Sequence, residues 1–116
     1  MSIEILLVED EPAHAELVQR AFAPRGQQFH LSLACTLAEA RQKLASQLPA
    51  LIIADWLLPD GESLQFIRED GSDFSIPIIL MTSHGNEQIA VDAMKAGVLD
   101  YIVKTDQILA DMPHIA

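Results

Sequence analysis

Basic residues are scarce in this sequence: seven lysines and arginines stand against seventeen aspartates and glutamates, which gives a net charge of -10. A nucleic-acid interface needs a basic face to neutralise phosphates, so we expect no direct nucleic-acid binding. No apolar stretch reaches the roughly 20 residues of a membrane span, and the N-terminus lacks the layout of a signal peptide. We therefore expect a cytoplasmic protein without membrane contact.

Cysteine is nearly absent, and Cys35 on its own excludes an internal disulfide. It follows an apolar-alternating segment and has no partner thiol nearby, so we expect a buried, unreactive side chain. Internal repeats, low-complexity tracts and interdomain linkers are also lacking. With 116 residues, 50% of them hydrophobic, the chain has room for a single core, and we interpret 1–116 as one domain that folds alone.

Apolar runs alternate with helical patterns along the chain, which predicts β-α-β units and a parallel sheet. The expected strands cover residues 3–8, 29–34, 51–54, 76–81 and 99–103. The second strand alternates apolar and polar residues, so we expect it at an edge of the sheet. The others are nearly continuous in apolar residues, as is typical of strands covered on both faces.

Helical spacing separates these strands. Pro12 suits the first position of one helix, Thr36 and Glu39 fit a capping box at the start of the next, and Gly97 would close the fourth. A fifth helix would begin near Ile108 and stay unfinished, as expected for a domain excised from a longer protein. The expected inward-facing side chains are Leu17, Val18, Ala21 and Phe22, then Leu37, Ala40 and Leu44, then Leu64, Phe66 and Ile67, and then Ile89, Ala93 and Met94.

Polar side chains follow four of the five expected strands. They are Glu9 and Asp10 after the first strand, Asp55 after the third, Thr82 after the fourth and Lys104 after the fifth. In an open parallel sheet, ligands bind beyond the carboxyl ends of the strands. Converging carboxylates need a divalent cation, and a cation beside an available aspartate is suited to phosphorylation of a carboxyl group. No glycine-rich phosphate loop accompanies these residues.

Five ordered motifs carry a family resemblance. They are Val8-Glu9-Asp10-Glu11, Asp55-x-x-Leu58-Pro59, Met81-Thr82-Ser83, Ala96-Gly97 and Asp100-Tyr101-Ile102-Val103-Lys104. On these motifs the chain resembles the response-regulator receiver domain, the phosphoacceptor module of two-component signalling. The resemblance implies an α/β, flavodoxin-like, doubly wound fold with a five-stranded parallel sheet in the order 2-1-3-4-5 and a truncated last helix.

The resemblance makes Asp55 the phosphoacceptor, which receives a phosphoryl group from a histidine kinase or a phosphotransfer domain. The implied cofactor is Mg²⁺, bound by Asp10 and Asp55, by Glu9 through water, and by the backbone carbonyl of Leu57. Mg²⁺ prefers octahedral oxygen ligands and keeps several waters, so few protein ligands suffice.

The resemblance also implies a switch. Lys104 and the cation would offset the charge that develops when a carboxylate meets a phosphoryl group. Thr82 would bind a phosphoryl oxygen, and Tyr101 would then move from exposed to buried. The changed surface of the fourth helix, fifth strand and fifth helix would control an output domain or downstream protein, or form a homodimer. Such a domain assists its own phosphotransfer and autodephosphorylation, and its parent chain could include a histidine kinase.

The sequence departs from the family pattern at three places. Thr105 stands where the family has a proline after a cis peptide, and a cis bond before a non-proline residue costs about 3 kcal/mol. Ser63 occupies a usual glycine position and Gly61 lies two places earlier, so we expect a variant loop there. Leu57 and His84 hold the positions that tune hydrolysis. Because leucine cannot orient a water, we expect a slowly hydrolysing phospho-form.

The same residues bear on three other functions. A haloacid-dehalogenase-type hydrolase needs a second aspartate where Leu57 stands. A flavodoxin-like cofactor binder needs a phosphate loop where Glu9, Asp10 and Glu11 would repel a phosphate. A degenerate receiver that works only as a protein-interaction module remains the alternative, although every functional position is filled.

The histidines show no spacing suited to a zinc site. We interpret His14 and His30 as structural or surface residues and His84 as a rim residue. Trp56 is interpreted as a partly exposed aromatic that flanks the site and reports on it by fluorescence.

Overall fold

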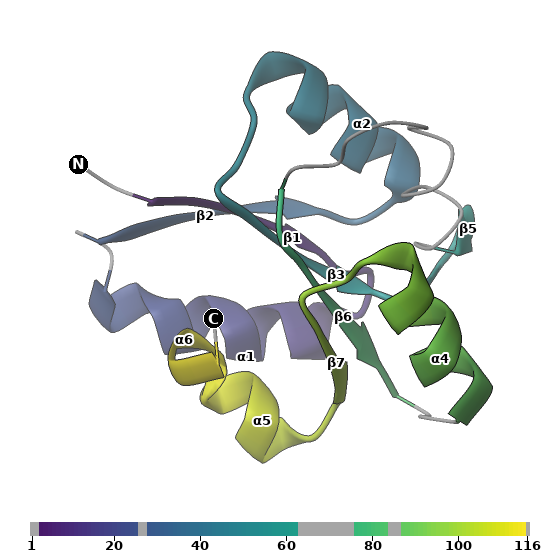
Figure 1. Ribbon diagram of the computed structural model, residues 1–116. Coiled ribbons are helices and arrows are strands. Elements are labelled where there is room, and N and C mark those ends of the chain that lie inside the picture. The colour runs from purple at the N-terminus through teal and green to yellow at the C-terminus, as the bar shows by residue number, and fades with distance from the viewer. Residues whose placement is uncertain (1–2, 26–27, 63–75, 84–86, 116) are drawn as a thin grey trace.

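A five-stranded parallel sheet forms the centre of the computed structural model, which describes residues 3–25, 28–62, 76–83 and 87–115. From edge to edge its strands are β2 (Phe29–Ala34), β1 (Ile3–Val8), β3 (Leu51–Asp55), β6 (Ile78–Thr82) and β7 (Asp100–Val103) (Figure 1). Two short strands after β3, β4 (Leu57–Leu58) and β5 (Gly61–Glu62), pair as an antiparallel hairpin. Counted without this hairpin the strand order is 2-1-3-4-5, which confirms the prediction and places β2 at an edge.

Helices cover both faces of the sheet (Figure 1). On one face lie α1 (Pro12–Phe22), α5 (Asp106–Ala110) and α6 (Met112–Ile115), with the short 3-10 helix η1 (Ala23–Arg25) after α1. On the other face lie α2 (Leu37–Ser46) and α4 (Glu87–Ala96). The expected helix with Leu64, Phe66 and Ile67 lies outside the described residues. No helix among those described is long and apolar enough to cross a membrane.

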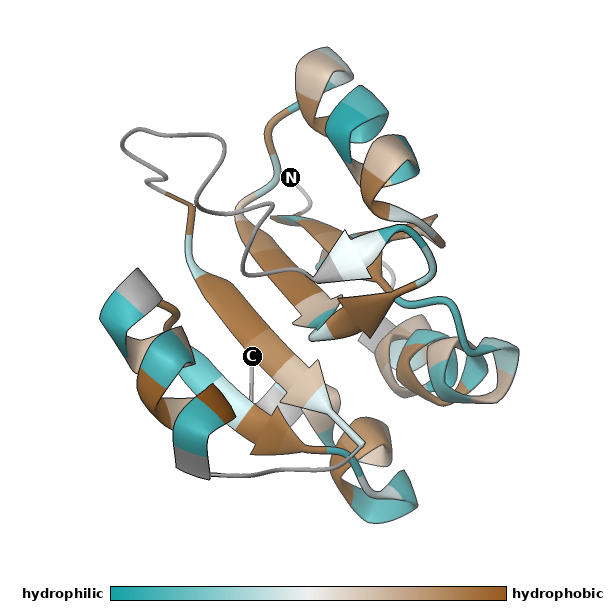
Figure 2. Cartoon of the chain, turned by 90° about the vertical axis from the view of Figure 1, so that its right-hand side faces the viewer, coloured by the Kyte–Doolittle hydropathy of each residue, from teal (hydrophilic) through white to brown (hydrophobic). Residues whose placement is uncertain are grey.

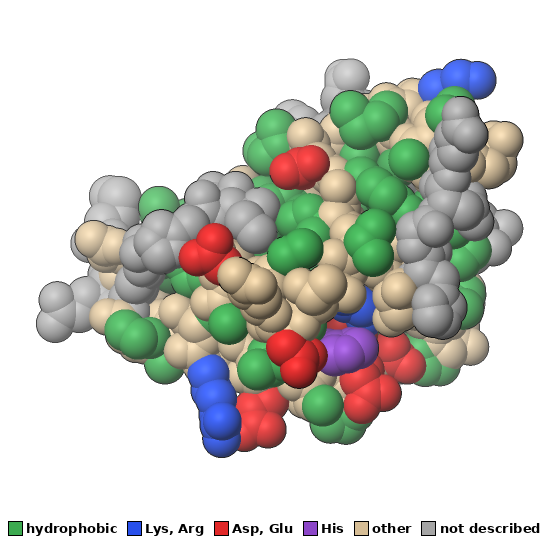
Figure 3. All heavy atoms as spheres, turned by 90° about the horizontal axis from the view of Figure 1, so that it is seen from below, with side chains coloured by type: hydrophobic (Ala, Val, Ile, Leu, Met, Phe, Trp, Pro, Cys, Tyr) green, Lys and Arg blue, Asp and Glu red, His purple; other side chains and the backbone are tan. Residues whose placement is uncertain are grey.

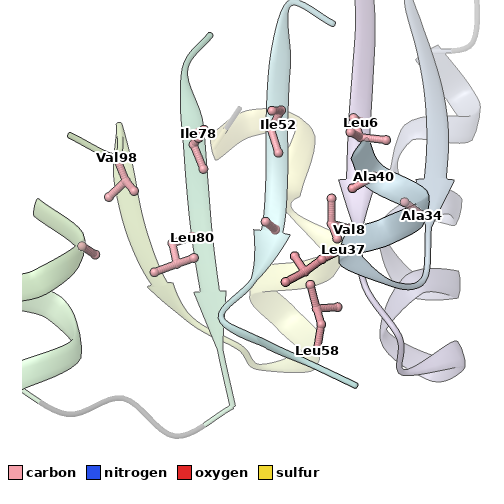
Figure 4. Close-up of a cluster of buried hydrophobic side chains, with 12 residues drawn as sticks. Leu6, Val8, Ala34, Leu37, Ala40, Ile52, Leu58, Ile78, Leu80 and Val98 are labelled. Atoms are coloured by element: carbon pink, nitrogen blue, oxygen red, sulfur yellow. The ribbon is translucent and has the colours of Figure 1, made fainter. Parts of the chain in front are cut away.

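Successive side chains of each strand enter two different cores, because they point to opposite faces of the sheet. In β1, Ile5 and Leu7 are buried in the core on the α1 side. Leu6 and Val8 are buried in the other core, where α2 contributes Leu37 (Figure 4). Burial of each large aliphatic side chain stabilises the fold by about 1.5–3 kcal/mol. The strands are accordingly mainly hydrophobic, while the helices also carry hydrophilic residues (Figure 2).

Local signals fix the ends of two helices. Thr36 accepts a hydrogen bond from the backbone N–H of Glu39 at 3.0 Å, and the Glu39 side chain accepts one from the N–H of Cys35 at 3.1 Å. The predicted capping box is therefore present, except that the Glu39 side chain bonds the N–H of Cys35 instead of that of the N-cap residue Thr36. Gly97 follows α4 with φ 90, and its N–H donates to the carbonyl of Met94, as expected for a left-handed helix end.

The segment after β7 forms two short helices rather than the beginning of one. Thr105 caps α5, since its hydroxyl accepts from the N–H of Ile108 at 3.1 Å. Leu109 and Met112 are fully buried against the α1 side of the sheet. No cis peptide occurs among the described residues, so the chain passes from Lys104 into this cap in the trans form.

Two predicted burials are wrong. Cys35 is exposed, because it lies in the connection between β2 and the cap of α2. Met94 is 57% exposed, whereas its neighbour Ala93 and Ile89 one turn earlier are buried. A step of one residue turns a side chain by about 100° around a helix, which carries Met94 off the inward face.

The predicted strand boundaries differ slightly from the structure. β6 begins at Ile78 rather than at residue 76, since Pro77 has no N–H to donate. β7 begins at Asp100, and Leu99 before it is exposed. β3 extends one residue further than predicted and includes Asp55.

Candidate functional site

The carboxyl edge of the sheet brings together side chains from three strand ends. The backbone N–H of Glu9 donates to the carbonyl of Ala34 at 2.9 Å, and that of Lys104 donates to the carbonyl of Thr82 at 2.7 Å. Asp55 is the last residue of β3 itself. The polar side chains are therefore carried by the rigid sheet and its direct extensions, which favours a fixed geometry.

The ammonium group of Lys104 lies at the centre of this cluster. Its Nζ donates to Glu9 Oε1 at 2.8 Å and to Asp55 Oδ2 at 3.1 Å, and it lies 3.0 Å from His14 Nδ1. Only 3% of the Lys104 side chain is exposed. Figure 3 shows this face of the molecule, with a histidine against a basic side chain and acidic side chains around them.

Three carboxylates form a possible cation site next to this ammonium. Glu9 and Asp55 are buried and Asp10 is exposed, and one oxygen of each lies within 4.8 Å of the others. The second oxygen of Glu9 accepts from the N–H of Glu11 at 3.2 Å. Oxygen ligands at this spacing suit a hard divalent cation such as Mg²⁺, and the exposed side of Asp10 leaves room for water ligands. The described residues thus fit the ion that the sequence predicted.

The electrostatics of the cluster favour a bound cation. Burial, reinforced by the negative charge of Glu9, raises the pKa of Asp55 to about 7, although Lys104 opposes this rise. Burial lowers the pKa of Lys104, but the hydrogen bond that its ammonium donates to Glu9 and the charges of Asp55 and Glu9 outweigh this effect and raise the pKa overall. The raised pKa keeps the ammonium charged at neutral pH, and one positive charge does not balance three carboxylates. A divalent cation would supply the missing charge and let Asp55 ionise fully.

The two predicted switch residues lie on the neighbouring strands. Thr82, the last residue of β6, is buried. Tyr101 in β7 is half-buried and contacts the core that contains Leu80 and Val98. Its hydroxyl is buried and has no hydrogen-bond partner among the described residues. The ring thus lies inward in this structure. Its unsatisfied hydroxyl costs free energy in this buried position.

The residues predicted to tune hydrolysis are placed only in part. Leu57 lies in β4, two residues after Asp55, and the residue is 55% exposed. Gly61 lies in the β4–β5 hairpin with φ 144, and Ser63, the other residue of the expected variant loop, lies outside the described residues. His84 lies outside the described residues.

Two contacts at this edge were not predicted from the sequence. His14, interpreted as structural or surface, contacts the buried ammonium of Lys104. Asp60 reaches across to the start of α2 and accepts from the backbone N–H groups of Leu37 at 2.9 Å and Ala38 at 3.0 Å. Spacing within the sequence carries no signal for either contact, since the partners come from distant segments. His30 is a surface residue, as predicted, paired with Glu4 at 2.7 Å.

Comparison with known proteins agrees with the geometry. Residues 5–111 match the family described as the response regulator receiver domain. The chain is 33% identical over 119 residues to the methanogenesis regulatory protein FilR1 of Methanothrix harundinacea, a match that covers 99% of this chain and 27% of FilR1. It is 35% identical over 107 residues to the phosphate regulon transcriptional regulatory protein PhoB of Klebsiella pneumoniae, covering 90% of this chain and 46% of PhoB. The chain thus spans less than half the length of these relatives.

Solved structures share the same fold. The Mn²⁺-bound form of response regulator Rcp1 superposes with a TM-score of 0.83 at 26% identity, covering 95% of this chain and 88% of Rcp1. The beryllofluoride-activated NtrC4 receiver domain dimer superposes with a TM-score of 0.78 at 28% identity, and the match covers 96% of this chain and 93% of the NtrC4 chain. Sequence, fold and the cluster at the strand ends lead to one conclusion: the chain belongs to the response regulator receiver domain family.

Proposed function

We propose that this domain accepts a phosphoryl group on Asp55 from a phosphorylated histidine of a kinase or phosphotransfer domain. The observation that carries the proposal is the 3.1 Å contact between Asp55 Oδ2 and the buried Lys104 ammonium, beside two further carboxylates. An Asp55 oxygen attacks phosphorus and forms an O–P bond as the N–P bond to the donor histidine breaks, and the imidazole nitrogen keeps the electron pair. Lys104 offsets the charge that gathers on the phosphoryl oxygens.

Mg²⁺ is the proposed cofactor. Asp10, Asp55 and, through water, Glu9 would hold it, with the backbone carbonyl of Leu57 as a further ligand. When bound, the ion supplies Lewis-acid stabilisation of phosphoryl oxygens. The Mn²⁺-bound form of Rcp1 supports a divalent cation in a related domain.

The proposed output is a packing switch. The Thr82 hydroxyl would donate to a phosphoryl oxygen on Asp55, and Tyr101 on the adjacent strand, whose ring already lies inward here, would be held in that position. The surface formed by α4, β7 and α5 would then change. These three elements are the fourth helix, fifth strand and fifth helix of the sequence prediction. Exposed Met94, Leu99 and Val103 give this face an apolar character.

This face is the proposed contact for an output domain or a downstream protein, or for a second copy in a homodimer. The NtrC4 receiver domain forms a dimer in its beryllofluoride-activated state, which supports the last possibility for a relative. A cytoplasmic location and autodephosphorylation, with Leu57 and His84 tuning its rate, belong to the same proposal.

The proposal is tested by adding a beryllofluoride salt and Mg²⁺ while following Trp56 emission, since Trp56 directly follows Asp55 and is half-buried. The wild type should show a saturable change in emission, and Asp55→Asn should show none. Glu16→Gln removes a charge from the exposed side of α1 and should respond like the wild type. A wild type without any response would favour the alternative, a receiver that works only as an interaction module.

A further inference from the structure

His14 occupies a defined place in the cluster at the strand ends. It lies in the first turn of α1, two residues after Pro12, and 29% of its side chain is exposed. Its Nδ1 lies 3.0 Å from Lys104 Nζ and 3.7 Å from Glu9 Oε1. The contact joins α1 to the end of β7, two segments that are 90 residues apart in the sequence.

The chemistry of the contact defines which atom donates. A lysine ammonium has three N–H donors and no acceptor. Its three neighbours here are Glu9 Oε1, Asp55 Oδ2 and His14 Nδ1. Because the ammonium can only donate, His14 Nδ1 is the acceptor in this contact. Each donor of the ammonium has one acceptor in this arrangement.

We propose that His14 is a positioning residue that holds the Lys104 ammonium in place beside Asp55. The inference rests on the proposed function of Asp55 and extends it. When a phosphoryl group arrives, the N–H that now points at Asp55 must turn to a phosphoryl oxygen. The bonds to Glu9 and His14 hold Nζ from two other directions, so the flexible lysine chain does not have to be ordered during the reaction.

An acceptor other than a carboxylate has an advantage at this position. A third carboxylate around Lys104 would add to the repulsion between Glu9 and Asp55, the two carboxylates that already contact its ammonium. An aliphatic side chain would leave one buried N–H of the ammonium without a partner, which is costly for a charged group. The imidazole satisfies the donor without adding negative charge.

The experiment compares His14→Asn with His14→Leu. The two replacements have nearly the same shape, but only asparagine can put an oxygen near the position of Nδ1. For the wild type and both variants, phosphorylation by acetyl phosphate with saturating Mg²⁺ is followed over a range of acetyl phosphate concentrations. In parallel, the Lys104 ammonium signal is recorded by ¹⁵N NMR without any phosphodonor, with Lys104→Met for assignment.

We expect His14→Leu to lower the maximal phosphorylation rate by about 10-fold, with little change in the half-saturating acetyl phosphate concentration. His14→Asn should recover most of this loss. The ammonium signal should be visible in the wild type and in His14→Asn, and be broadened or lost by faster solvent exchange in His14→Leu. Equal maximal rates and equal ammonium signals in both variants would overturn the inference.

The two readouts separate this inference from the function on which it rests. If the wild type takes no phosphoryl group, the proposed function fails, and the NMR comparison still decides whether His14 orders Lys104. If the wild type is phosphorylated but both variants lose the same share of the maximal phosphorylation rate, the hydrogen bond from Lys104 to His14 does not cause the loss. The inference is then wrong. Thermal midpoints of both variants show whether each is folded at the assay temperature.

Discussion

One carboxylate oxygen of Asp60 accepts a hydrogen bond from the backbone N–H of Leu37 at 2.9 Å, and the other accepts from Ala38 at 3.0 Å. Two of the first N–H groups of α2, which have no partner within the helix, are satisfied in this way. Because Asp60 lies in the turn between β4 and β5, the same bonds fasten the loop after Asp55 to α2. The loop that borders the site is therefore anchored at a second point.

Replacing Asp60 with alanine should destabilise the fold. We expect the free energy of unfolding to fall by about 1 kcal/mol, as for other lost helix caps, in urea denaturation at pH 7. Glu16→Ala is the matched control, since it removes an acid whose partner, Arg20, is exposed, and it should cost at most about 0.5 kcal/mol. Equal losses in the two variants would show that the Asp60 bonds contribute nothing specific.

The Asp60 contribution should also depend on pH. The hydrogen bond from Leu37 holds the pKa of Asp60 below its ordinary value of 3.8. A lowered pKa in the folded state means that the stabilisation is present above the unfolded pKa and is lost as the pH falls through the folded one. The difference between wild type and Asp60→Ala should therefore shrink below pH 4. A difference that stays constant down to pH 2 would contradict the assignment.

Asp55 should produce the opposite pH dependence in metal-free protein. Its pKa rises from 3.8 to about 7 on folding, so the unfolded chain loses this proton first. Stability should decrease as the pH rises from about 4 to 7, by a total on the order of a few kcal/mol, and then level off. Asp55→Asn should lack this decrease, which urea denaturation across the pH range measures. Parallel curves for the two proteins would contradict it.

Mg²⁺ should stabilise the domain, and Asp10 should be required. Any ligand that binds only the folded state raises the thermal midpoint as its concentration exceeds the dissociation constant. We expect this rise in the wild type and its loss in Asp10→Asn, measured by differential scanning fluorimetry at pH 8. Glu11→Gln removes the neighbouring exposed acid and should keep the rise. If Glu11→Gln loses it and Asp10→Asn keeps it, the proposed ligand set is wrong.

Leu57 should slow the loss of phosphate from Asp55. Its exposed aliphatic side chain offers no group that could orient an attacking water. Leu57→Asn should shorten the lifetime of the phospho-form by about 10-fold, a modest part of what a positioned polar group contributes. Phosphate release after removal of the donor gives the rate, and Leu57→Met serves as the aliphatic control. A wild-type lifetime of seconds in Mg²⁺ buffer would contradict the prediction.

The strands and helix starts were predictable because their signals are local. The continuous apolar run 51–54 indicates a strand, and the pair Thr36 and Glu39 indicates a helix start, each within a few residues. The errors arose where position on an element decides burial. Met94 belongs to the apolar pattern of α4 but lies one residue past the inward Ala93, and Cys35 leaves the sheet after Ala34. A single step along the chain reverses burial in both cases.

The site was predictable in composition but not in detail. A parallel sheet gathers its strand ends, so Glu9, Asp55 and Lys104 had to meet once the strands were assigned. The reach of His14 from α1 and of Asp60 from a hairpin turn depends on how separate elements are placed in three dimensions. No periodicity or spacing encodes that placement.

The most direct measurement is the chemical location of the phosphoryl group. After incubation with acetyl phosphate and Mg²⁺, borohydride reduction converts an aspartyl phosphate to homoserine, and tandem mass spectrometry then finds the converted residue. We expect homoserine at position 55 alone in the wild type, and none in Asp55→Asn. Conversion at another acid, or equal conversion in Asp55→Asn, would contradict it.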